Sequence, residues 1–121
     1  MAESLLFPCS HGEDAPERAT VPFIAAATAA ASGHPTIVVC TIEAVWLGLP
    51  AHADRIAEDG LPALLDLQRH LVEAGGQIWL CSACTTKRGI TGDTPLVTGA
   101  RIVGAATIVE ALSQGRAITL A

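Results

Sequence analysis

Apolar and polar positions alternate along the chain in blocks that predict strands and helices in turn. Short, continuously apolar runs rich in β-branched residues are typical of strands buried on both faces, as in parallel sheets. Such runs predict strands at residues 5–7, 36–40, 77–81, 101–103 and 116–120. The first strand is expected to end at Pro8, because proline has no N–H group for a sheet ladder.

Helical patterns separate these strands. Residues 61–74 place Leu64, Leu67 and Leu71 on one stripe and charged side chains on the other side, which predicts an amphipathic helix. Shorter helices are expected at 43–47, 82–88 and 105–113, and residues 48–60 form a loop with at most one helical turn.

The alanine-rich run 23–31 favours a helix that ends at Gly33. Its beginning is open, because a proline in a helix interior clashes with the preceding turn. Either the helix begins near Val21, with Pro22 in its first turn, or two short helices abut there.

Strands that alternate with helices imply right-handed crossover connections and a mainly parallel sheet. The expected fold class is α/β: a three-layer α/β/α Rossmann-like domain with about five strands. Neither an internal repeat nor a linker interrupts residues 1–121, so the chain is expected to form a single domain.

Composition narrows the choice of partners. Of the 121 residues 50% are apolar, only 3% are aromatic, and the formal net charge is −5 without clustered cations. Nucleic acid is therefore not expected as a partner, since its binding needs clustered cations or aromatic platforms. No apolar run approaches the roughly 20 residues of a membrane span, and no secretory signal is recognisable. We expect a cytoplasmic protein with reduced cysteines.

Three cysteines fall where predicted strands end. In open α/β sheets ligands bind beyond the carboxyl ends of the strands, which draws attention to Cys9, Cys40 and Cys81. The apolar neighbours of Cys40 favour a small core residue. Cys9 lies beside His11 in a polar loop, where an ordinary loop thiol is the favoured interpretation.

Cys81 is the strongest candidate for chemistry. It closes a buried strand, precedes a predicted helix and forms a C-x-x-C pair with Cys84. Backbone N–H groups at a helix start stabilise a thiolate, the reactive form of cysteine. Lys87 and Arg88 either add positive potential or are simply solvated.

Metal binding is a weaker alternative. Cys9, His11, Cys81 and Cys84 contain the atoms that zinc prefers. However, structural zinc usually joins close-spaced ligand pairs in small folds that lack a core, and this chain has ample core material. Surface positions are expected for the remaining histidines, which are His34, His52 and His70.

Several segments resemble one known family, the DsrE-like sulfur-relay family (DsrE-, TusD- and YchN-type proteins). The most specific is residues 81–90, CSACTTKRGI, preceded by GGQIWL. The opening loop and helix (12–29), the second strand with its turn (36–47) and the closing unit (97–112) resemble the family in the same order. The resemblance covers nearly the whole chain.

This resemblance implies a Rossmann-like fold that assembles into homotrimers or homohexamers. It also implies a persulfide on the cysteine that matches Cys81, exchanged with donor and acceptor proteins or small thiols, and hence a possible sulfurtransferase without a cofactor. Family subunits with a lone cysteine have no counterpart of Cys84, which instead matches a branch of the family with a C-x-x-C pair.

Two other functions remain open at this stage. Cys81 and Cys84 are also compatible with a dithiol redox or metal-binding module. A non-catalytic subunit that binds a small ligand or supports assembly is the third alternative. Trp46, Leu47 and Leu49 form either part of an exposed apolar patch for a partner or, for Trp46, part of the core.

Overall fold

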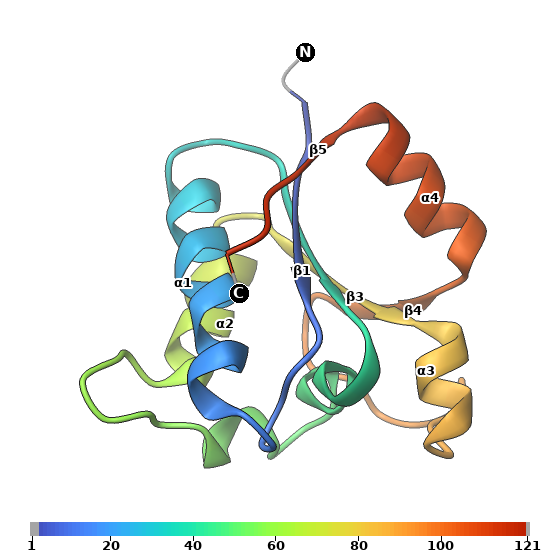
Figure 1. Ribbon diagram of the computed structural model, residues 1–121, viewed down its shortest axis with the longest axis horizontal. Helices are drawn as coiled ribbons and strands as arrows, with labels where there is room; N and C mark the ends of the chain where they lie inside the picture. Colours follow the sequence, from blue (N-terminus) through green and yellow to red (C-terminus); the bar gives the residue numbers. More distant parts are fainter. Residues whose placement is uncertain (1–2, 121) are drawn as a thin grey trace.

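The computed structural model describes residues 3–120, and its strands form one parallel sheet in the order β4-β3-β2-β1-β5 (Figure 1). The strands are β1 (Leu5–Cys9), β2 (Thr36–Cys40), β3 (Gln77–Cys81), β4 (Ala100–Val103) and β5 (Arg116–Ala117). The helices are α1 (Pro16–Ala31), α2 (Leu64–Glu73), α3 (Ser82–Lys87) and α4 (Ala105–Gln114), with 3₁₀ helices η1 (Ile42–Gly48) and η2 (Ala53–Arg55) after β2.

Helices lie on both sides of the sheet, which confirms the predicted three-layer α/β/α fold. Figure 1 shows α1 and α2 together on one face, α4 on the other, and α3 at the carboxyl end of β3. Among residues 3–120, no helix has both the length and the apolar character that a membrane crossing requires.

The two faces of the sheet carry unequal cores. Because successive side chains of a strand point to opposite faces, each strand contributes to both. The larger core packs strand residues such as Val38 and Leu80 against α1 and α2. The smaller core gathers Leu6, Ile37, Val39, Trp79, Val103 and Ile108 on the α4 side. The α4 side therefore has the thinner cover.

The predicted end of the first strand at Pro8 is wrong, since β1 continues to Cys9. Along β1, the backbone groups of alternate residues face β5 and β2 in turn. The carbonyls of Ser4 and Leu6 accept hydrogen bonds from Arg116 and Ile118, so the backbone nitrogen of Pro8 also faces β5. No bond to β2 is lost, because β2 pairs with the other edge of β1. The missing N–H instead ends the β1–β5 ladder, which stops at Ala117 rather than the predicted residue 120.

The two alternatives for the first helix are both wrong. One helix runs from Pro16, a favourable first-turn position, through Pro22 to Ala31. Pro22 removes only the bond to the carbonyl of Arg18, and its own burial with Phe23 against the core offsets that loss. The predicted ending is confirmed, because Gly33 adopts φ +92° just beyond the helix.

The helix predicted at 61–74 begins later, at Leu64. Pro62 disfavours a helical conformation at Leu61, and Ala63 is extended with ψ 135°. The N–H of Leu64 donates to the carbonyl of Ile56 across the loop at 3.0 Å.

Of the two alternatives for Trp46, Leu47 and Leu49, the exposed apolar patch is wrong, and Trp46 packs against the larger core. Leu47 is fully buried, and the half-buried Trp46 stacks on His52 with ring centroids 5.4 Å apart. The large apolar side chains that are exposed among residues 3–120 are Ile42, Val109, Leu112 and Leu120.

Candidate functional site

Cys81 lies at the junction between β3 and α3. It is the last residue of the strand and the cap of the helix, with φ −63° and ψ 124°. Its side chain is half-buried and packs against the smaller core on the α4 side of the sheet. A sulfur at this position remains within reach of solvent while it faces the first turn of the helix.

The surroundings of Cys81 favour its thiolate. Partial burial raises the pKa, but the backbone N–H groups of Cys84 and Ala83 and the Cys84 thiol together lower it below the ordinary 9.0. The N–H groups at the beginning of α3 have no partners within the helix and are therefore free to stabilise a negative charge.

Cys84 lies one turn along α3, within hydrogen-bonding reach of the Cys81 sulfur. It is half-buried and packs against the larger core, on the side of the sheet that α1 covers. Both cysteines are free thiols. The structure thus places the two predicted site residues near one another, on the first turn of α3.

Cys9 and Cys40 form a different pair. They are register partners at the ends of β1 and β2, and both are buried in the larger core. Burial raises the pKa of Cys9 to about 12 and that of Cys40 well above 9.0. The Cys9 thiol donates to the carbonyls of His11 and Ala19 at 3.5 and 3.7 Å. Neither group is a thiolate near neutral pH.

The four ligands considered for zinc are not assembled. Among residues 3–120, no three His, Cys, Asp or Glu side chains lie close enough to share a metal ion. Cys9 belongs to the larger core and Cys81 to the α4 side, with the sheet between them. His11 instead bonds through Nδ1 to Asp14 at 3.1 Å.

Arg88 has a role that the sequence did not reveal. Its Nε donates to a carboxylate oxygen of Glu43 at 2.7 Å, and its guanidinium also donates to the carbonyl of Cys84 at 3.2 Å. It therefore fastens the end of α3 to η1, and its charge is matched by Glu43. Lys87, by contrast, is exposed. A lone carboxylate in an apolar stretch, such as Glu43, is the sequence signal that could have indicated this ion pair.

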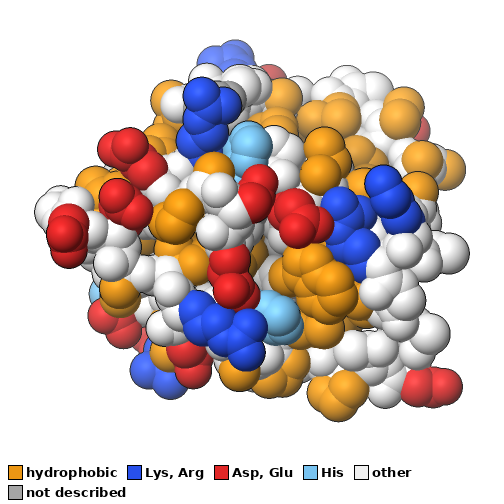
Figure 2. All heavy atoms as spheres, turned by 60° about the horizontal axis from the view of Figure 1, so that its bottom comes forward, with side chains coloured by type: hydrophobic (Ala, Val, Ile, Leu, Met, Phe, Trp, Pro, Cys, Tyr) orange, Lys and Arg blue, Asp and Glu red, His pale blue; other side chains and the backbone are white. Residues whose placement is uncertain are grey.

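Charged groups gather over the carboxyl end of the sheet. Figure 2, with this end turned forward, shows acidic, basic and histidine side chains interleaved across its centre. Glu13 accepts from His52 at 3.1 Å and from Arg55 at 3.3 Å, and the bond from His52 lowers the pKa of Glu13. A hollow of ≈ 260 Å³ lies among them, lined by Glu13, Glu43, Trp46, His52 and Arg55.

The predicted surface positions of His34 and His70 are confirmed, since both are exposed. His52 is different: it is half-buried between Trp46 and Glu13. The expectation of a plain surface residue is wrong, because Trp46 and Glu13, which come from other segments of the chain, cover part of the ring.

Ile42, which precedes Glu43 in the sequence, adopts an unusual backbone conformation. It follows β2 at the beginning of η1, with φ +54°, and 52% of its surface is exposed. A β-branched residue in the left-handed region is strained, and such strain is concentrated at functional sites. Sequence reasoning missed Ile42, because nothing in its local pattern distinguishes it from a core residue.

Comparisons with known proteins agree with the architecture. The model of the DsrE/DsrF-like family matches residues 3–120. The Escherichia coli YchN crystal structure has a TM-score of 0.79 and 18% identity, covering 99% of this chain and 100% of that one. MTH1491 from Methanobacterium thermoautotrophicum, titled a protein of unknown function, has a TM-score of 0.73, 18% identity and coverage of 98% and 99%. No curated protein matches this chain.

Proposed function

Because the chain belongs to the DsrE/DsrF-like family, we propose that it carries sulfane sulfur as a persulfide on Cys81. The observation that carries this proposal is a half-buried thiol whose thiolate is favoured by the N–H groups of Ala83 and Cys84. Thiolate is the form of cysteine that accepts and releases sulfur. Cys81 combines a lowered pKa with access to solvent, whereas Cys9 and Cys40 are buried and have raised pKa values.

Sulfur uptake is a nucleophilic exchange. The Cys81 thiolate attacks the outer sulfur of a donor persulfide, a new S–S bond forms, and the donor's S–S bond breaks. The donor leaves as a thiolate, and Cys81 holds the persulfide. The reverse attack by an acceptor thiolate removes the outer sulfur and restores the Cys81 thiolate. No external oxidant or reductant is needed.

The beginning of α3 supports both half-reactions. The N–H groups that favour the thiolate also favour a persulfide anion, which is held one bond further out. The Arg88–Glu43 pair holds α3 against η1 and keeps this turn in place. Donor and acceptor are proteins or small thiols that reach the carboxyl end of the sheet, and we extend the proposal to a homotrimer or homohexamer working in the cytoplasm.

The nearby Cys84 thiol, which helps to lower the pKa of Cys81, supports a second candidate function, a dithiol redox module. The Cys84 thiolate attacks the inner sulfur of the Cys81 persulfide, sulfide leaves, and a Cys81–Cys84 disulfide forms. The persulfide is reduced to sulfide and the two thiols are oxidised. In this case the protein releases sulfide instead of passing sulfane sulfur to an acceptor.

Intact-mass analysis tests the proposal and separates the two functions. Reduced protein is incubated with a persulfide donor such as glutathione persulfide. The wild type and Cys84→Ser are expected to gain the mass of one sulfur atom, and Cys81→Ser is not. If the wild type loses two hydrogens and releases sulfide, while Cys84→Ser retains the adduct, the dithiol function is correct. An adduct on Cys81→Ser, or none on Cys84→Ser, contradicts the carrier.

A further inference from the structure

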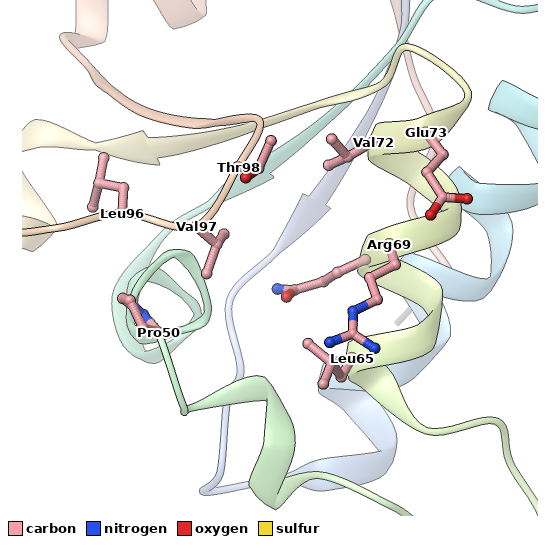
Figure 3. Close-up of a pocket in the computed structure, with 9 residues that line it drawn as sticks. Pro50, Leu65, Arg69, Val72, Glu73, Leu96, Val97 and Thr98 are labelled. Atoms are coloured by element: carbon pink, nitrogen blue, oxygen red, sulfur yellow. The ribbon is translucent and has the colours of Figure 1, made fainter.

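A cavity of ≈ 480 Å³ opens between α2 and the segment that leads into β4, and neither Cys81 nor Cys84 lines it (Figure 3). Its lining comes from one side of α2, from Leu96, Val97 and Thr98, and from Pro50 after η1. This volume falls in the range of about 300–1,000 Å³ in which proteins bind small molecules.

The walls of the cavity are held in place by the backbone. The N–H of Val97 donates to the carbonyl of Gly48 at 2.8 Å, which ties the segment before β4 to the end of η1. Gly99 adopts φ +85° and lies so close to α2 that a Cβ there would come within 2.6 Å of Val72. Only glycine allows this approach, so the cavity is a built feature of the fold.

Gln68 presents an unused acceptor to this cavity. The side chain is only 4% exposed, and its Nε2 donates to the carbonyl of Leu47 at 2.8 Å. A carbonyl only accepts, so the amide nitrogen must face Leu47 and Oε1 must face away from it. Within residues 3–120, Oε1 has no hydrogen-bond partner, yet it is not sealed from solvent. An amide oxygen without a partner in the protein is available to an N–H or O–H donor from water or from a ligand.

Opposite charges lie at the edge of the same cavity. Arg69 and Glu73 are both exposed, on successive turns of α2 (Figure 3). Within the described part of the chain, neither forms an ion pair. Between them and the loop, Leu65, Val72, Leu96 and Val97 supply apolar walls.

We propose that this cavity binds an apolar α-amino acid in its zwitterionic form. The carboxylate pairs with Arg69, the ammonium group donates to Gln68 Oε1 and faces Glu73, and the side chain packs on Leu96 and Val97. A simple fatty acid leaves Gln68 and Glu73 unused. The site is independent of the sulfur chemistry, because it shares no residue with Cys81 or its surroundings.

Titration of ¹⁵N-labelled protein with L-leucine tests this binding. Saturable amide shifts are expected along α2 and residues 96–99, without shifts at Cys81. Two probes each lack one charged group: 4-methylpentanoate has no ammonium and 3-methylbutylamine has no carboxylate. Each is expected to bind at least about tenfold more weakly than L-leucine.

Matched variants complete the experiment. Arg69→Gln removes an exposed cation from the cavity and is expected to weaken L-leucine binding about tenfold. Arg18→Gln removes an exposed cation from α1 and is expected to change nothing. The proposal is overturned if L-leucine gives no saturable shifts at millimolar concentration, if both variants bind alike, or if 4-methylpentanoate binds as tightly as L-leucine.

Discussion

Cys40 and Cys81 occupy equivalent places in the chain and have opposite properties. Each is the last residue of a five-residue strand, and each is followed by a helical segment within two residues. Cys40 is fully buried and burial raises its pKa well above 9.0. For Cys81, the N–H groups of α3 and the Cys84 thiol together outweigh burial and lower the pKa.

A one-residue difference in register accounts for this contrast. Cys40 lies opposite Leu80, so Cys81 stands one residue further along the sheet and points to the other face. Cys40 points into the larger core beneath α1 and α2, and Cys81 points to the thinly covered α4 side. The face of the sheet, and not the strand end as such, therefore decides whether the pKa of a cysteine is raised or lowered here.

Alkylation provides the largest expected difference between the two cysteine environments. At neutral pH, the pKa of Cys9 of about 12 leaves at least about 1,000-fold less thiolate than the pKa of Cys81, which lies below 9.0. Iodoacetamide labelling followed by peptide mass spectrometry is expected to modify Cys81 at least this much faster than Cys9 or Cys40. Equal rates in the folded protein contradict the contrast.

The pH profile of the same reaction sharpens this prediction. Because the pKa of Cys81 is lowered, its thiolate persists to lower pH than that of an ordinary cysteine, and its labelling rate falls only below that range. In Cys84→Ser, which keeps the N–H groups and changes one donor, the midpoint is expected to shift only slightly. A midpoint at or above 9.0 in the wild type would refute the proposed activation.

Replacing each cysteine by serine compares burial directly. Cys40→Ser places a hydroxyl in a sealed apolar position and is expected to lower the free energy of unfolding by about 1–3 kcal/mol. Cys81→Ser changes a half-buried atom beside N–H donors, and its effect is expected to stay within about 0.5 kcal/mol. Urea denaturation measures both, and a larger loss for Cys81→Ser would reverse the assignment of the faces.

Arg88 and Lys87 offer a smaller comparison within α3. Arg88→Gln breaks the bond to Glu43, and the expected loss is about 1 kcal/mol after allowance for the 41% exposure of the glutamate. Lys87→Gln removes an exposed cation and is expected to cost less than about 0.5 kcal/mol. Thermal denaturation gives the stability of each variant. If the Arg88–Glu43 pair keeps α3 in position, Arg88→Gln is also expected to slow the iodoacetamide labelling of Cys81, and Lys87→Gln is not.

Ile42 gives an expected difference in stability of the same size as that at Arg88. Ile42→Gly removes the strain of φ +54° and is expected to be more stable than Ile42→Ala by about 1 kcal/mol. The alanine variant is the control, because it loses the side chain and keeps the strained Cβ. Equal stability of the two variants in urea denaturation would mean that the turn after Cys40 relaxes to another conformation.

Most strands and helices could be predicted from local sequence patterns, because the forces that favour them act between residues close together in the chain. The apolar run 36–40 needs a sheet with both faces covered, and β2 is buried throughout. The effects of Pro8 and Pro22 could not be predicted in the same way, since the energetic cost of a proline depends on the groups packed beside it. Pro8 is tolerated in β1 because it faces the short β5, and Pro22 because it packs into the core. Both surroundings are made by residues far away in the chain.

The candidate site divides in the same way. The order strand, Cys81, helix is written in consecutive residues, and so is the spacing to Cys84; backbone N–H groups at a helix start follow from that order alone. Tertiary packing decided which thiols are sealed, that Arg88 reaches Glu43 across 45 positions, and that Gln68 lines a cavity. Burial, ion pairing and enclosure depend on segments meeting in space, so neighbours in the sequence do not specify them.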